Sequence, residues 1–301
     1  MHRTYDAAGV RAFYDGYGER EWTRLLVRPS DEVSFFVYRH YLARFVRPGA
    51  RVLEIGAGPG RFTIELARLG ARVSVGDLSD TQLRLNAHFV QEAGCEHAVE
   101  ARLPLDAVDL SRFLAGSFDA VVCYGGILSY LFDRAGDALG EMLRVGRPGG
   151  EVLVSVMSHL YNLCKRDVLA RLPLLTQDGE AGLFEDGDHC GPLADGHEMR
   201  LYRFETLEAL CAGRSGTIVA ASAVNCLSAG NDDALTEVWA RPELWSHFLA
   251  WELREGARRP RRRTPPARHG APGQPGVTRL GFPRGASLPA RSPDRPLKRR
   301  K

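Results

Sequence analysis

Short apolar runs alternate with helical patterns between residues 51 and 156. The apolar runs are rich in Val, Leu and Ile, which is typical of strands in a parallel sheet that is buried on both faces. Amphipathic stretches with helical spacing separate these runs, and this alternation predicts a doubly wound, mostly parallel α/β fold. The expected strands are residues 52–55, 72–76, 95–101, 118–123 and 151–156, and the expected helices are residues 62–69, 81–93 and 139–145.

Residues 1–50 have a different pattern, because aromatic and aliphatic side chains recur at helical spacing on both sides of a break at residues 28–31. We expect an N-terminal helical cap that ends at Pro48 and Gly49. Most of its aromatic side chains suit a packing face, and Tyr14 and Tyr17 are the two to test for contacts with a ligand.

The alternation of strands and helices is interrupted after residue 157. Residues 158–175 have a helical pattern, and residues 176–199 are rich in Gly, Asp and His with few apolar residues. An insertion at this place would cover a substrate, because loops on a rigid scaffold carry specificity. We therefore expect one α/β domain over residues 51–255, with residues 158–203 as its insertion, followed by a helix at 204–213, a strand at 217–224 and a helical pattern within 231–255.

Charge and proline content change abruptly at residue 256. The segment 256–301 contains twelve Arg and two Lys against one acid, Asp294, so the residues before it are acidic although the whole chain carries a net charge of +3. This composition predicts a disordered basic tail. Three explanations remain open: an arm that binds nucleic acid or an acidic surface, a solvated extension without a role, and a frameshift in a GC-rich gene, of which we favour the last two.

No apolar run has the 18 or so residues of a membrane span, and the charged N-terminus has no signal-peptide core. The six cysteines are widely spaced and form no C-x-x-C pair. We expect a soluble cytoplasmic protein without a membrane partner and without a metal. The acids and histidines of the insertion lack a recognised metal-ligand spacing; they are Asp186, Asp188, His189 and His197.

A glycine-rich turn joins the first expected strand to the first expected helix of the α/β domain. Glu54 is followed by Gly56, Gly58 and Gly60 at alternate positions, and such a turn lets backbone approach a nucleotide at a helix N-terminus. The dinucleotide fingerprint G-x-G-x-x-G would need glycine where this chain has Arg61. An NAD-dependent oxidoreductase is therefore disfavoured.

Asp77 ends the second expected strand, 21 residues after Gly56. An acid at about this spacing accepts hydrogen bonds from the hydroxyls of a ribose. The alternative is that Asp77 only caps the following helix. We favour the ribose contact, with Leu78 packing on an adenine ring.

The pattern Glu54-x-Gly56-x-Gly58-x-Gly60, followed by Asp77 and by LRVGRPGGEVLVSV at residues 143–156, resembles the class I S-adenosylmethionine-dependent methyltransferases. The resemblance implies a seven-stranded type of sheet that ends in an antiparallel strand. After Glu255 we find no convincing candidate for that strand; residues 277–282 are the only short one. It also implies S-adenosyl-L-methionine as cofactor, bound by Glu54, Gly56, Ala57, Gly58, Gly60, Asp77, Leu78, Asp106 and Tyr124, with Asp106 placed for the adenine amino group.

The loop at residues 124–130 follows the fourth expected strand and should border the site of methyl transfer, because ligands bind where the strand order of an open α/β sheet reverses. A general base is needed only for some acceptors, and His197, His159 and Tyr124 are the candidates. An Asn-Pro-Pro-Tyr loop, used by adenine methyltransferases of DNA, is absent.

The sequence thus favours a methyltransferase that acts on a small-molecule acceptor. Two alternatives remain. One is an RNA methyltransferase that uses the basic tail as an electrostatic arm. The other is a binding or regulatory protein that holds the cofactor without turnover.

Overall fold

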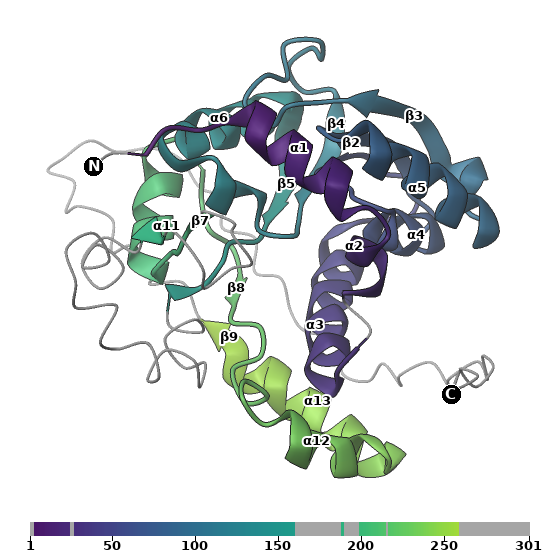
Figure 1. The fold of residues 1–301 in the computed structure, drawn as a ribbon. Helices are drawn as coiled ribbons and strands as arrows, with labels where there is room; N and C mark the ends of the chain where they lie inside the picture. The colour runs from purple at the N-terminus through teal and green to yellow at the C-terminus, as the bar shows by residue number, and fades with distance from the viewer. Residues whose placement is uncertain (1–2, 25–26, 160–187, 190–198, 215, 259–301) are drawn as a thin grey trace, which may run out of the picture. The chain divides into compact units, whose positions relative to one another are not determined.

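Five parallel strands form the central sheet of the computed structural model (Figure 1), in the order β3-β2-β1-β4-β5. The structure describes residues 3–24, 27–159, 188–189, 199–214 and 216–258. The strands are β1 Arg51–Ile55, β2 Arg72–Asp77, β3 Val99–Pro104, β4 Phe118–Cys123 and β5 Gly146–Val154. The strand order reverses between β1 and β4, which pair in parallel. The doubly wound parallel fold predicted from the sequence is confirmed.

Side chains of alternate residues in the strands enter two cores, one on each face of the sheet. Val52, Val73 and Val122 pack with helices α3 and α4 on one face. Leu53, Val121 and Met142 of helix α6 lie in the core of the other face. The helices that flank or follow the sheet are α3 Pro29–Phe45, α4 Arg61–Arg68, α5 Asp80–Glu92, α6 Ala135–Val145 and α11 Phe204–Ala212.

The N-terminal cap consists of α1 Ala7–Tyr17, α2 Arg20–Thr23 and α3. Helix α1 packs against α5. Helices α12 Asp232–Trp239 and α13 Pro242–Gly256 pack against α3, where Glu32 accepts hydrogen bonds from the indole nitrogens of Trp239 and Trp245. The N-terminal and C-terminal helices of the described chain therefore share one apolar cluster around Val33.

Three strands differ from the sequence prediction. Strand β5 spans Gly146–Val154 rather than 151–156, because Gly146 already pairs with Phe118 before a register shift. Strand β3 begins at Val99 rather than at residue 95, because residues Glu96–Ala98 form a 3-10 turn. The strand expected at 217–224 is reduced to β8 Ala221–Ser222, which pairs antiparallel with β9 Ala257–Arg258 rather than with the central sheet. A short strand thus does follow Glu255, but it adds nothing to the five parallel strands described here.

Four further elements of the described chain are short. The 3-10 turns η2 Ile127–Tyr130 and η3 Phe132–Arg134 follow β4. Strands β6 Asp188–His189 and β7 Met199–Arg200 form a separate two-stranded ladder. None of the helices in the described ranges has the length and apolar character needed to cross a membrane.

Candidate active site

The glycine turn after β1 has a backbone that only glycine adopts without strain. Gly56, Gly58 and Gly60 have φ angles of +65°, +53° and +98°. A Cβ on Gly56 would lie 2.4 Å from the side chain of Ile127, so close packing adds a second reason for glycine there. The amide of Ala57 donates to the carbonyl of Gly76 at the end of β2. The turn is therefore fixed against the neighbouring strand.

Asp77 lies at the end of β2 with its carboxylate held by backbone. Its Oδ2 accepts from the Gly58 amide and its Oδ1 from the Ser79 amide, both at 2.8 Å. A carboxylate oxygen has two lone pairs, so each oxygen keeps one acceptor site. Burial raises the pKa of Asp77 to about 6, and the two amides and the nearby Glu21 modify that shift.

Glu54 is buried behind the turn and does not line either cavity described below. Its Oε2 accepts from the hydroxyl of Thr63 at 2.6 Å, and Asn86 donates to the same hydroxyl at 2.9 Å. Burial raises the pKa of Glu54 to about 8, and its Oε1 has no hydrogen-bond partner. Through these hydrogen bonds Glu54 links the end of β1 to α4 and α5, on either side of the glycine turn.

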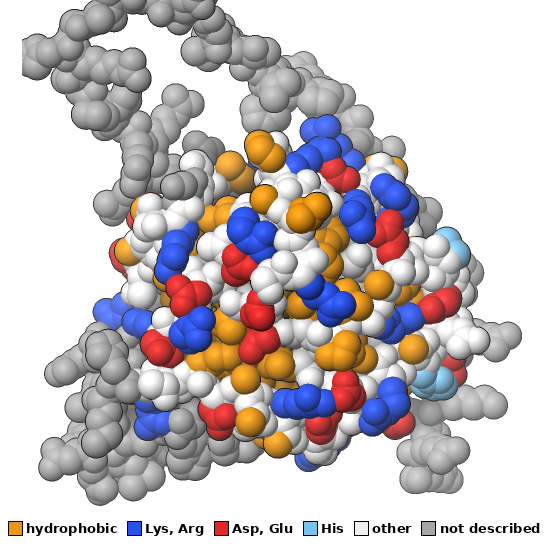
Figure 2. Space-filling model, turned by 90° about the horizontal axis from the view of Figure 1, so that it is seen from above, with side chains coloured by type: hydrophobic (Ala, Val, Ile, Leu, Met, Phe, Trp, Pro, Cys, Tyr) orange, Lys and Arg blue, Asp and Glu red, His pale blue; other side chains and the backbone are white. Residues whose placement is uncertain are grey.

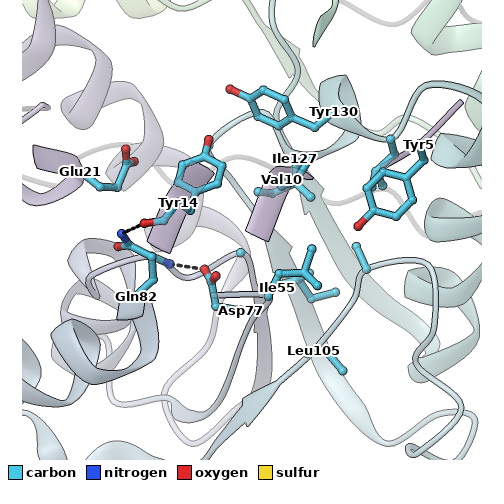
Figure 3. A pocket seen from close by; sticks show the side chains of 16 residues that line it. Tyr5, Val10, Tyr14, Glu21, Ile55, Asp77, Gln82, Leu105, Ile127 and Tyr130 are labelled. Atoms are coloured by element: carbon cyan, nitrogen blue, oxygen red, sulfur yellow. Dashed lines mark hydrogen bonds between the residues drawn. The ribbon is translucent and has the colours of Figure 1, made fainter. Parts of the chain in front are cut away.

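A first cavity opens above the carboxyl ends of β1, β2 and β4 (Figure 3). It is partly open to solvent. Four of the predicted cofactor residues line it: Gly56, Gly58, Asp77 and Leu78. The remainder of the lining is mostly apolar and comes from Ile55, Leu105, Ala107, Ile127, Tyr130 and Leu131, with Gly125 and Gln82.

The N-terminal cap covers this cavity. Tyr5, Val10, Tyr14 and Glu21 all line it (Figure 3). The ring of Tyr14 meets the ring of Tyr130 edge-on, 6.2 Å between centroids, and burial raises the pKa of the Tyr14 phenol well above 10. Of the two aromatic residues chosen from the sequence, Tyr14 lies in the cavity lining and Tyr17 does not.

Asp106 follows β3 and is hydrogen-bonded to Tyr5 at the start of the N-terminal cap. Its Oδ1 accepts from the hydroxyl of Tyr5 at 3.0 Å and from the amide of Val108 at 3.1 Å. Its neighbours Leu105 and Ala107 line the first cavity, whereas Asp106 itself does not. Contact of Asp106 with an adenine amino group remains a prediction, and Tyr5 is a neighbour that the sequence pattern gave no reason to choose.

A second cavity adjoins the first, and the two share lining residues Glu21, Gly56, Gly58 and Gly125. Aromatic rings are prominent in its lining: Tyr38 packs 4.7 Å from Tyr124, and Phe62 packs 5.2 Å from Tyr124, between ring centroids. The point where the two cavities meet lies at the reversal of strand order between β1 and β4.

The three candidate general bases differ in where the structure places them. Tyr124 lines the second cavity rather than the first, and burial raises its pKa far above 10, which opposes a role as base near neutral pH. His159 lines the second cavity, is 3% exposed, and neither ring nitrogen has a hydrogen-bond partner among the residues that the structure describes. Burial, with the charge of Arg203, lowers the pKa of His159, so its ring is neutral at pH 7. His197 lies outside the described residues.

The metal hypothesis finds no further support in the described ranges, where no group of three His, Cys, Asp or Glu side chains could hold an ion. Asp186 and His197 fall outside those ranges. For Asp188 and His189 the structure gives backbone placement in β6.

Several residues of the site were missed by the sequence analysis. Tyr5, Glu21 and Gln82 lie outside any local motif, because helices of the cap and of α5 bring them to the cavity only in the folded chain. Ile127 could have been found, since it lies in the 124–130 loop that the sequence places at the transfer site.

The strand order, the glycine turn and the acid at the end of β2 define a Rossmann-like nucleotide-binding domain. Residues 52–150 match the family model described as a methyltransferase domain. This part of the chain is a methyltransferase domain.

Two curated methyltransferases resemble part of the chain. A ubiquinone biosynthesis O-methyltransferase from Xanthomonas oryzae pv. oryzae is 32% identical over 117 residues, which is 38% of this chain and 46% of the relative. A demethylmenaquinone methyltransferase from Clavibacter sepedonicus is 34% identical over 124 residues, covering 40% of this chain and 48% of the relative. The chain thus matches slightly less than half the length of these relatives.

Among solved structures, the magnesium protoporphyrin IX methyltransferase from Synechocystis PCC 6803, determined with bound S-adenosylhomocysteine, superposes with a TM-score of 0.53. The match covers 72% of this chain and 93% of that chain at 16% identity. At this identity the likeness shows a shared fold.

Proposed function

We propose that this protein transfers a methyl group from S-adenosyl-L-methionine to a small-molecule acceptor. The observation that carries the proposal is the first cavity, where Asp77 is held against the amide of Gly58 beside an apolar lining and the opening to a second cavity. A methyltransferase family match over residues 52–150 supports the same reading.

The residues present fit this cofactor. Asp77 keeps two acceptor sites for the hydroxyls of a ribose, and no Cβ stands on Gly56 or Gly58 to block approach to the turn. Leu78 and Leu105 offer apolar surface for an adenine ring. The shape of the glycine turn depends on Ala57, Gly60 and Glu54. We propose that Asp106 contacts the adenine amino group. Tyr124 contributes to the second cavity.

When bound, S-adenosyl-L-methionine would supply a methyl group on a positively charged sulfur, which an acceptor atom attacks in line with the sulfur as leaving group. The chain's task is to hold two reactants in line and to exclude water. A mostly apolar cavity covered by Tyr5, Val10 and Tyr14 suits that task. Such a lining also favours a reaction in which charge on the donor is lost, because charged groups are poorly solvated there.

His159 is the proposed base if the acceptor carries a proton on the reacting atom. Its ring is neutral near pH 7 and lines the second cavity with both nitrogens unpartnered. His197 stays a second proposal.

The second cavity favours an acceptor that contains an aromatic or quinone-like ring. Tyr38, Phe62 and Tyr124 place three packed aromatic rings around it, and stacked or edge-on rings bind planar aromatic molecules well. The relatives named for ubiquinone and menaquinone biosynthesis suggest the same class of acceptor. A panel of phenols, quinols and aromatic amines is the appropriate first set.

Calorimetric titration with S-adenosyl-L-methionine tests the cofactor assignment. We expect binding by the wild type, at least tenfold weaker binding by Asp77→Ala, and loss of binding by Gly58→Val. Gly94→Val is a matched control, because Gly94 also has a positive φ of +69° but has no atom within 4 Å of its would-be Cβ and lines neither cavity. Equal binding by all four proteins would refute the assignment. A chain that binds the donor but yields no S-adenosylhomocysteine with any acceptor would instead be the non-catalytic binding protein.

A further inference from the structure

Arg61, which occupies the position of the missing third glycine, makes a specific set of contacts with the N-terminal cap. It is the first residue of α4, directly after the glycine turn. Its Nε donates to the carbonyl of Trp22 at 2.9 Å, and its Nη2 donates to the same carbonyl. The guanidinium carbon also lies 3.9 Å from the centroid of the Trp22 ring. One side chain thus holds both the backbone and the indole of Trp22.

The indole of Trp22 is held from another direction by α5. Its ring stacks on Phe89 with 4.0 Å between centroids and 5° between planes. Arg61, Trp22 and Phe89 therefore join α4, α2 and α5. We call these three side chains the Trp22 latch.

The latch fixes a part of the chain that lines both cavities. Glu21, adjacent to Trp22, lines the first and the second cavity, and Arg24 lines the second. On the other side, Gln82 donates to the carbonyls of Tyr14 and Gly18 at 3.0 and 3.2 Å, which anchors the end of α1. Any displacement of residues 14–24 would therefore move the cover of the first cavity and the wall of the second together.

Arginine suits this position for reasons that lysine does not share. A planar guanidinium can donate two hydrogen bonds to one carbonyl while stacking on an aromatic face, whereas an ammonium is a compact and strongly hydrated charge. The carbonyl of Trp22 belongs to a helix of four residues, whose last carbonyls have no intrahelical donor. Burial lowers the pKa of Arg61 to about 10, so the side chain remains charged at neutral pH.

We propose that Arg61 is a positioning residue that holds the N-terminal cap closed over the first cavity through Trp22, and that it thereby sets how long the methyl donor stays bound. The effect of Arg61 on how long the donor stays bound rests on the proposed function. The role of Arg61 in holding the cap through Trp22 concerns the chain alone.

The test compares Arg61→Lys with wild type and with a matched control, Arg44→Lys. Arg44 also lies over an aromatic ring, 5.0 Å from the centroid of Phe45, but it lines neither cavity. Hydrogen exchange of the full-length protein without ligand should show faster exchange of the amides of residues 7–24 in Arg61→Lys. The amides of β1 and β2 should exchange as in wild type, and Arg44→Lys should match wild type throughout.

The donor readout is the release rate of S-adenosyl-L-methionine measured by stopped flow. We expect release on the order of tenfold faster in Arg61→Lys, which corresponds to about 1.4 kcal/mol, and unchanged release in Arg44→Lys. Trp22→Phe keeps a ring on Phe89 and the backbone carbonyl, so its release rate should fall between wild type and Arg61→Lys.

Two results would overturn the proposal. One is exchange of residues 7–24 that is no faster in Arg61→Lys than in Arg44→Lys. The other is faster exchange throughout the chain, including β1 and β2, because that would make Arg61 a general stabiliser. If wild type fails to bind S-adenosyl-L-methionine, the proposed function is wrong, and so is the proposed effect of Arg61 on donor release. The exchange experiment still decides whether Arg61 holds the cap.

Discussion

Asp77 and Glu54 show how two buried carboxyls on neighbouring strands acquire different properties. Asp77 accepts two backbone amides, whereas Glu54 accepts one side-chain hydroxyl and leaves Oε1 without a partner. Hydrogen bonds to the charged form oppose the effect of burial on a pKa. The pKa of Asp77 therefore rises only to about 6 and that of Glu54 to about 8. At pH 7 Asp77 is charged and Glu54 is mostly neutral.

Donor affinity should depend on pH through Asp77. A carboxylate accepts from two hydroxyls and a protonated carboxyl accepts less well, so affinity for S-adenosyl-L-methionine should fall as the pH is lowered through about 6. Asp77→Asn should bind more weakly, on the order of tenfold, and without this pH dependence. Calorimetry between pH 5 and 8 checks both. The same pH dependence in the variant would assign it to another group.

Stability should depend on pH through Glu54. The folded protein keeps a proton on Glu54 up to about pH 8, whereas the unfolded chain releases it near 4.5. Stability from this group is therefore fully present below pH 4.5 and is lost as the pH rises toward 8, by up to about 1.4 kcal/mol for each pH unit. Glu54→Gln cannot titrate. The melting temperature of wild type relative to this variant should fall from pH 5 to 8 and then level off; a constant difference would contradict the assignment.

At the scale of elements, the docking of α1 on α5 depends on Asp15. Its Oδ1 accepts from the hydroxyl of Ser79 at 2.5 Å and from the amide of Thr81 at 3.2 Å, at the N-terminus of α5. These hydrogen bonds lower the pKa of Asp15. A carboxylate at a helix N-terminus is favourable because free amides and the helix dipole point toward it.

Replacing Asp15 by Ala should loosen α1 and weaken donor affinity by roughly three- to tenfold, as expected for loss of a capping carboxylate. Asp109→Ala is the control, because Asp109 also accepts a backbone amide, from Ser111 at 3.0 Å, but this contact is local and does not join the cap to α5. Calorimetry at pH 7 compares the two variants. Equal affinities would show that the α1–α5 contact does not matter for the donor.

The sequence predicted those elements whose pattern is local. Val52–Ile55, the turn at Gly56–Gly60 and Asp77 were predicted because burial on both faces, positive φ and a strand-end acid leave direct marks on the residues themselves. The start of β3 was not predicted, because a 3-10 turn precedes it. The shortness of β8 was not predicted either, because its partner Ala257–Arg258 is distant in the sequence. Tyr5 and Glu21 join the site through tertiary contacts and leave no local pattern.

At the scale of the whole molecule, the described residues, which lie between 3 and 258, belong to one compact unit. The face of the described residues seen in Figure 2 mixes acidic and basic side chains with apolar ones and carries no continuous basic stripe. The concentrated positive charge of the chain lies in the sequence after residue 256. The RNA methyltransferase alternative places nucleic-acid binding in that tail.

A chain shortened after Pro260 should keep its melting temperature and its affinity for S-adenosyl-L-methionine, because the contacts of the cavities come from earlier residues. Thermal melting and calorimetry check this. The RNA methyltransferase alternative requires the opposite for RNA: salt-dependent binding by the full chain that disappears on shortening. Retention of RNA binding by the shortened chain would contradict a role of the tail as an electrostatic arm.

Glu21 belongs to the lining of both cavities, and this shared wall has a consequence for kinetics. Closure of residues 14–24 over a bound donor would also complete the chamber for the second reactant, so the two reactants should add in a compulsory order with the donor first. Product inhibition distinguishes this order from random addition. S-adenosylhomocysteine should compete with the donor and inhibit non-competitively toward the acceptor, and the methylated product should leave before it.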